Sequence, residues 1–149
     1  MEQPNVNSLS AVKETSTKEA RAIHDRVLVL DSHIDFEPED LTGERNYTQR
    51  GETQFNLPNM IDGGLDALFF VIYVGQTRES QNPDAFQAAG YERAYQAAVE
   101  KFAAVHRFSS EIAPERIDIA LSAADIRRIH ADGKKAALMG VENGYPLGD

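Results

Sequence analysis

The segment Val27-Leu28-Val29-Leu30-Asp31-Ser32-His33-Ile34-Asp35 is an apolar run that ends in a histidine and a carboxylate two residues apart. The run predicts a strand over residues 27–31 that leads directly into the polar pair. Because strand side chains alternate between the two faces of a sheet, His33 and Asp35 should point the same way. We therefore expect them to lie close enough together to share one metal ion.

A second apolar run, residues 136–141, ends in Glu142 and is followed by Asn143-Gly144. Its carboxylate is a third candidate ligand at the end of a strand, where enzymes built on parallel sheets keep their chemistry. Polar residues at strand ends also serve solubility and helix capping, and Asn-Gly is typical of a plain turn. The pattern alone leaves both interpretations open.

The remaining elements predict an α/β fold. Residues 66–74 form a nearly continuous apolar run, typical of a strand buried on both faces. Residues 57–63 suit a short helix, residues 83–107 a long helix capped by Asn82, and residues 122–131 a helix that opens with a Ser122/Asp125 capping box. Residues 117–121 suit a short strand or an extended lead-in. Three strong strands separated by long crossovers indicate parallel pairing, in a small open sheet or an incomplete barrel.

Two regions are expected to lie outside this regular structure. Residues 1–17 are polar and predict a disordered N-terminal tail, which leaves residues 18–149 as the folded domain, beginning with a short helix over 18–26. Residues 36–56 are polar and long for a connection inside a compact domain, which favours a lid or a disordered loop.

Composition narrows the classes of partner and ligand. A net charge of -9 with a pI near 4.9 argues against binding nucleic acid or anionic lipid. The absence of cysteine excludes disulfides and thiolate ligands, so a metal would rest on His, Asp and Glu, a set that suits zinc, manganese or iron. No signal peptide or membrane segment is visible, which predicts a cytoplasmic protein, and a homo-oligomer remains possible.

The other histidines and aromatic residues favour structural roles. His24, His106 and His130 lie in or near predicted helix ends, where an imidazole is mildly favourable and solvated. Tyr91, Tyr95 and Phe102 recur at helical spacing and are expected to pack into the core. Tyr73 could line a cleft beside the second strand, but burial is the simpler expectation.

Taken together, three segments resemble the N-terminal part of the membrane-type (renal-type) dipeptidases, zinc metallopeptidases built on a (β/α)8 barrel. The matching segments occur in order: Leu30-Asp31-Ser32-His33-Ile34-Asp35, Asn56-Leu57-Pro58 through Gly63-Gly64-Leu65-Asp66-Ala67-Leu68-Phe69-Phe70, and Gly140-Val141-Glu142-Asn143-Gly144. They span about residues 23–149. The combination is more specific than any one of them.

The resemblance implies a two-zinc site in which His33 and Asp35 bind one metal and Glu142 bridges both. A hydroxide held between the metals would attack the carbonyl of a dipeptide substrate, while the metals stabilise the oxyanion. In the family, two further histidine ligands and the substrate-binding arginine, aspartate and histidine lie downstream of the glutamate motif. Asn143 and Tyr145 stand where the family often has glycine and histidine.

The resemblance thus predicts the first three strand-helix units of a TIM-type barrel, incomplete and inactive as an isolated 149-residue chain. Two alternatives stay open. One is an amidohydrolase-type barrel acting on another amide or a lactone, although such barrels usually open with His-x-His, where this chain has Asp35. The other is a non-catalytic α/β binding module whose acidic strand ends only solvate one rim.

Overall fold

Four parallel strands form a single sheet in the computed structural model, which describes residues 16–53, 55–76 and 83–148. The strands are β1 (Leu30–Ile34), β2 (Ala67–Tyr73), β3 (Ile117–Ile119) and β4 (Lys135–Glu142). Their order in the sheet is β1-β2-β4-β3, and every pairing is parallel. The α/β class expected from the sequence is therefore confirmed.

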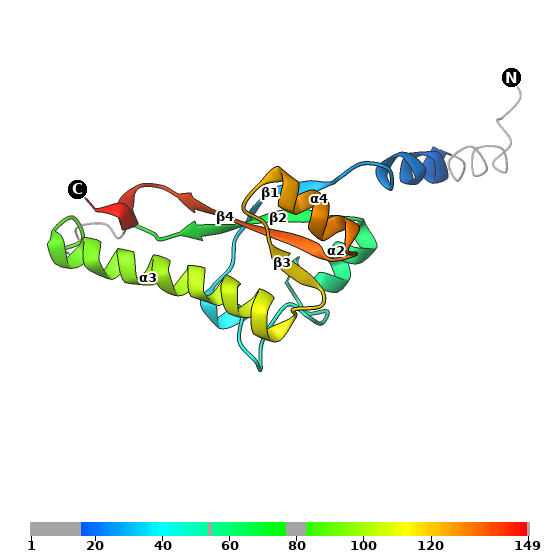
Figure 1. Ribbon diagram of the computed structural model, residues 1–149. Helices are drawn as coiled ribbons and strands as arrows, with labels where there is room; N and C mark the ends of the chain where they lie inside the picture. The colour runs from blue at the N-terminus through cyan, green and yellow to red at the C-terminus, as the bar shows by residue number, and fades with distance from the viewer. Residues whose placement is uncertain (1–15, 54, 77–82, 149) are drawn as a thin grey trace, which may run out of the picture.

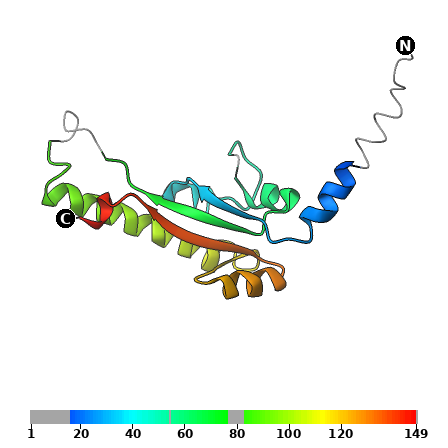
Figure 2. The same ribbon diagram turned by 90° about the horizontal axis from the view of Figure 1, so that it is seen from above.

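The helices are α2 (Leu57–Gly63), α3 (Ala88–Arg107) and α4 (Ala123–Ala131), joined by short helical turns at Pro38–Asp40, Phe108–Ile112 and Tyr145–Leu147. The long helix α3 runs along the sheet. A further helix over residues 16–24 precedes β1 and projects away from the rest of the described chain (Figures 1 and 2). Residues 1–15 of the expected tail lie outside the described residues, and residues 16 and 17 already belong to the projecting helix.

The main core lies between α3 and one face of β2 and β4. Phe70 is fully buried at its centre and makes edge-to-face ring contacts with Phe36 at 5.2 Å, Phe55 at 5.7 Å and Phe108 at 6.4 Å. Two of these rings, Phe36 and Phe55, come from the polar segment 36–56. That segment therefore packs on the core through its few large apolar side chains, and disorder was the wrong expectation for its described residues.

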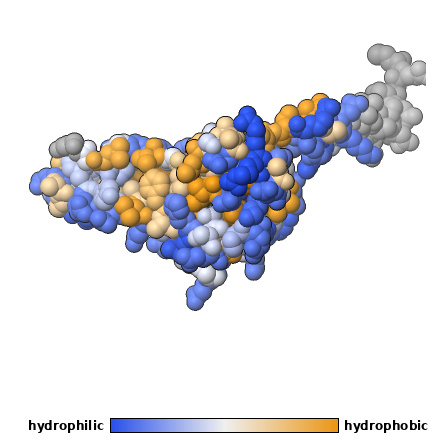
Figure 3. All heavy atoms as spheres, in the orientation of Figure 1, coloured by the Kyte–Doolittle hydropathy of each residue, from blue (hydrophilic) through white to orange (hydrophobic). Residues whose placement is uncertain are grey.

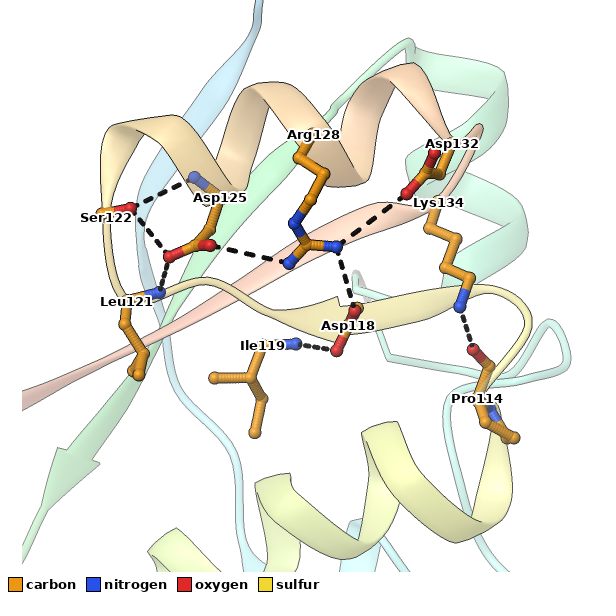
Figure 4. Close-up of polar contacts among 9 residues, drawn as sticks. All are labelled: Pro114, Asp118, Ile119, Leu121, Ser122, Asp125, Arg128, Asp132 and Lys134. Atoms are coloured by element: carbon orange, nitrogen blue, oxygen red, sulfur yellow. Dashed lines mark hydrogen bonds and ion pairs between the residues drawn. The ribbon is translucent and has the colours of Figure 1, made fainter.

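Helix α4 covers the other face at the amino end of the strands, where Ile129 packs with three alanines: Ala67, Ala120 and Ala136. Its first turn is capped as predicted, because Ser122 Oγ accepts a hydrogen bond from the Asp125 N–H at 3.2 Å. Arg128 reaches the carboxylates of Asp118, Asp125 and Asp132 at 3.6 to 3.9 Å and so connects the helix to β3 (Figure 4).

Two predicted element starts were wrong. β1 begins at Leu30 instead of Val27, because the Val29 N–H donates to the side chain of Asp66, ahead of β2, and the first paired residues are Leu30 and Ala67. α3 begins at Ala88 instead of Pro83, because the extended backbone of Gln87 interrupts the helix. The turn before Gln87 folds against Gly90, where a Cβ would lie 2.1 Å from the Ala85 carbonyl oxygen. The predicted cap, Asn82, lies outside the described residues.

Candidate metal centre

A one-residue irregularity in β1 decides which face of the sheet His33 occupies. Asp31 pairs with Leu68, but Ile34 pairs with Phe70, so one extra residue separates the two pairs. Without this shift, His33 would stand opposite Phe70 on the core face. The shift places Ile34 on the core face instead and turns His33 to the opposite face. The Asp31 carboxylate accepts the His33 N–H at 2.9 Å and stabilises the irregularity.

Glu142 is the last residue of β4 and lies on the same face as His33. It pairs with Tyr73, which is three residues beyond Phe70 on β2 and therefore on the face away from the core. His33 Nε2 lies 3.4 Å from Glu142 Oε2 and 3.6 Å from Asp35 Oδ1. One ligand atom from each of the three residues lies within 4.8 Å of the other two. We call His33, Asp35 and Glu142 the ligand cluster.

The side chain of Asn143 fixes the turn after Glu142 by hydrogen bonds to the segment after β2 and to the residues that follow the turn. Asn143 adopts a left-handed φ of 68°, and its side-chain amide donates to the Val74 carbonyl at 3.2 Å while its oxygen accepts the Tyr145 N–H at 3.0 Å. The buried Tyr145 hydroxyl in turn donates to the Ala85 carbonyl at 2.7 Å. The expected turn at residues 143–144 is therefore present, and it fixes the end of β4 against the end of β2.

The charge balance of the ligand cluster favours a cation. Among the residues that the structure describes, His33 is the only ion-pair partner of Asp35 and of Glu142. All three side chains are about half exposed or more, so a metal ion has direct access from solvent. One imidazole and two carboxylates with open positions for water form a ligand set that fits zinc, manganese or iron.

An open hollow of about 630 Å³ adjoins the cluster and is lined by residues that include His33, Asp35, Asp40 and Tyr47. Tyr47 hydrogen-bonds to Asp40 at 3.3 Å, and its pKa is raised above the ordinary tyrosine value, mainly by burial and further by the Asp40 charge. Tyr47 therefore remains a neutral donor at physiological pH. Because the hollow lies beside two candidate ligands, a small molecule bound there would reach the cluster.

The structure brings together the three residues singled out in the sequence and leaves the other histidines apart from them. His24 lies 3.2 Å from the Gly64 carbonyl, and His130 lies 3.2 Å from Asp66 at the amino end of the strands. Two expectations of burial were wrong: Tyr73 is 43% exposed and Tyr95 is 52% exposed. The buried stripe of α3 runs instead through smaller residues such as Ala94, Ala98 and Ala104, which let the helix approach the sheet closely.

Sequence reasoning missed the hydrogen bond between Asp31 and the His33 N–H and the burial of Lys101, which is 7% exposed. Asp31 carries no signal beyond its place two residues before His33. Lys101 could have been found, because it lies three residues after Ala98 and four before Val105, on the apolar face of α3.

Comparison with known proteins gives two positive findings. The sequence profile of the membrane dipeptidases (peptidase family M19) matches residues 17–149. A comparison with curated proteins gave no match. Among solved structures, the probable dipeptidase PvdM from Pseudomonas aeruginosa is 24% identical with a TM-score of 0.76, over 91% of this chain and 33% of that one.

Two further solved structures are similar over 82% of this chain. One is the metallopeptidase dipeptidase AC, which is 25% identical with a TM-score of 0.62. The other is a metallopeptidase from Rhodobacter sphaeroides bound to a phosphinate mimic of L-Ala-D-Ala, which is 26% identical with a TM-score of 0.63. This chain spans only 33 to 40% of the length of these three proteins. Because the family profile matches nearly the whole chain, residues 17–149, the chain belongs to the membrane dipeptidase family, peptidase family M19.

Proposed function

We propose that this chain contributes the first strands and part of the metal centre of a zinc-dependent dipeptidase. The observation that carries the proposal is the ligand cluster, in which atoms of His33, Asp35 and Glu142 lie within 4.8 Å of one another on one face of a parallel sheet. Family membership supports the same assignment, because the related structures are metallopeptidases and one is bound to a dipeptide mimic.

The sheet fits a partial (β/α)8 barrel. β3 pairs only with residues 135–137 of β4, so residues 138–142 have no neighbour on that side among the described strands, and β1 is the opposite edge of the sheet. Unpaired edges and exposed apolar side chains favour pairing with further strands. Apolar surface gathers near the projecting helix and over the middle of the sheet (Figure 3), and exposed apolar residues include Val27, Leu28 and Val141.

Among the described helices, none combines the length and the apolar character that a membrane-spanning helix requires.

In this proposal His33 and Asp35 would hold one zinc ion, and Glu142 would supply a carboxylate to it and to a second ion. Bound zinc would activate water for attack on the peptide carbonyl and stabilise the resulting negative charge. His33 must present an unprotonated Nε2 to bind, so metal affinity should fall as the pH is lowered. The hollow beside the cluster is large enough for a small peptide.

Zinc binding and hydrolysis assays test the proposal. The purified 149-residue chain should bind zinc but should not hydrolyse dipeptides, because the described residues supply only one group of three ligands. Robust zinc-dependent hydrolysis by this chain alone would contradict the partial-barrel account. Preference for a cyclic amide over dipeptides in the native protein would favour an amidohydrolase instead. Intact-mass measurement of the native protein, with sequencing past codon 149, tells whether one polypeptide carries further strands.

A further inference from the structure

Helix α3 buries one charged side chain, Lys101, in the main core, where it contacts the residues that follow Asp35. Lys101 is only 7% exposed. It lies on the helix face that also buries Ala94, Ala98 and Ala104. A buried ammonium group costs several kcal/mol unless it is well paired, whereas an apolar side chain of similar size would avoid this cost. The contacts that Lys101 makes are therefore the place to look for its role.

Among the described residues, the ammonium group of Lys101 contacts the two residues that follow Asp35. Lys101 Nζ donates to the Phe36 carbonyl at 2.7 Å and forms an ion pair with Glu37 Oε2 at 2.9 Å. The same ammonium group lies 5.1 Å from the centre of the Phe36 ring, within the range of a cation–π contact. The carbonyl and ring of Phe36 and the carboxylate of Glu37 thus share one cation.

Asp35 depends on this anchor because strand pairing has already ended. The last paired residue of β1 is Ile34, opposite Phe70, so none of the described strands pairs with the backbone of Asp35. The next fixed point along the chain is Phe36, whose carbonyl is held by Lys101 and whose ring packs edge-to-face on Phe70 at 5.2 Å. Asp35 is therefore held between a paired residue before it and an anchored residue after it.

We propose that Lys101 is a positioning residue that fixes Asp35 for metal binding by holding the backbone at Phe36 and the side chain of Glu37. The inference rests on the proposed function, because it presupposes that the ligand cluster binds a metal. Lys101 also neutralises Glu37, which lies two residues from Asp35 in the sequence.

Binding of Co²⁺, followed by its visible absorption, tests the proposal without relying on activity. Lys101→Met removes the cation and keeps an apolar chain of similar length. We expect it to raise the Kd for Co²⁺ about tenfold and to change the absorption band, because Asp35 is no longer held in place. Lys101→Arg keeps the charge and the donors and should recover most of the affinity.

The matched control is Lys134→Met. Lys134 also donates to a backbone carbonyl, that of Pro114 at 2.8 Å, but it touches none of the ligand cluster. This variant should bind Co²⁺ like the wild type. If Lys101→Met binds Co²⁺ with the affinity and spectrum of the Lys134→Met control, the inference is overturned while the proposed function stands.

The remaining outcomes are also decisive. If Lys101→Met fails to fold, Glu37→Gln replaces it, since this exposed side chain can change without opening the core. We expect Glu37→Gln to raise the Kd for Co²⁺ about threefold, and an unchanged Kd would overturn the inference. If the wild type binds no Co²⁺, or if His33→Ala binds Co²⁺ as tightly as the wild type, the proposed function itself fails and the inference fails with it.

Discussion

The two ends of the sheet carry similar residue types in opposite states of charge balance. At the amino end, the carboxylate of Asp66 is buried and accepts hydrogen bonds from the Val29 N–H at 3.1 Å and from Lys135 Nζ at 3.3 Å. His130 Nδ1 lies 3.2 Å away. One acidic group is thus surrounded by donors from β4, α4 and the segment before β1.

At the carboxyl end the proportions are reversed. Asp35 and Glu142 share the single imidazole of His33, and all three side chains face solvent. A carboxylate with enough donors of its own contributes to stability, whereas two exposed carboxylates that share one imidazole leave room for a cation. The charged groups at the amino end therefore stabilise the fold, whereas those at the carboxyl end form the proposed metal site. In (β/α)8 barrel enzymes, likewise, residues at the carboxyl ends of the strands form the active site and residues at the amino ends contribute to stability.

The largest expected effect is loss of metal binding from the carboxyl end. His33→Ala and Glu142→Ala each remove one of the three proposed ligands and should weaken zinc binding about 100-fold or more, measured by isothermal titration calorimetry. Wild-type affinity in both variants would show that the cluster only solvates the rim, as expected for a non-catalytic module.

Substitution at the amino end should give the opposite pattern. Asp66→Asn keeps the shape of the side chain but removes the charge that Lys135 and His130 face. We expect it to lower the free energy of unfolding by about 2 kcal/mol, measured by urea denaturation, with zinc affinity unchanged. A variant of normal stability and weakened zinc affinity would contradict the division between the two ends.

The turn after Glu142 sharpens the comparison, because it connects fold to site. Asn143→Ala loses both side-chain hydrogen bonds. It also leaves a residue with a Cβ atom at a left-handed φ of 68°, where those bonds no longer offset the strain. It should destabilise the protein by about 1.5 kcal/mol. Asn143→Gly loses the same bonds but tolerates the backbone and should cost less. Equal losses in the two variants, compared by urea denaturation, would rule out backbone strain.

The smallest expected effect lies at the start of α4, where Ser122 holds the pKa of Asp125 below its ordinary value of 3.8 by donating a hydrogen bond at 2.7 Å. Ser122→Ala should destabilise the protein by about 0.5 to 1 kcal/mol at neutral pH. A lowered pKa stabilises the fold above pH 3.8, and this contribution is lost as the pH falls below that value. The difference between variant and wild type should therefore shrink at pH 2 to 3, and a constant difference would contradict this account.

Much of the architecture could be predicted because local patterns decide it. The apolar runs of β2 and β4 and the capping box of α4 specify their elements with little help from the rest of the chain. The three candidate ligands were found because they follow apolar runs. Their face of the sheet was less certain: alternation places His33 and Asp35 together, but only the irregularity beside Asp31 places them with Glu142.

What could not be predicted depends on contacts between distant residues. β1 starts late because of the bonds between Val29 and the start of β2, which lies nearly 40 residues away. The described part of segment 36–56 packs on the core because Phe36 and Phe55 contact Phe70, which the polar composition of the segment does not indicate. The burial of Lys101 could be read from its place on the apolar face of α3, but its partner, the Phe36 carbonyl, is 65 residues away in the sequence and no local pattern points to it.

The most direct test of the central claim is anomalous X-ray diffraction from crystals of the protein grown with zinc, recorded on both sides of the zinc absorption edge. The account predicts an anomalous peak within about 2.0 to 2.2 Å of His33 Nε2 and of carboxylate oxygens from Asp35 and Glu142. A peak confined to another acidic group, such as the carboxylates around Arg128, or no peak at the cluster in saturating zinc, would contradict it.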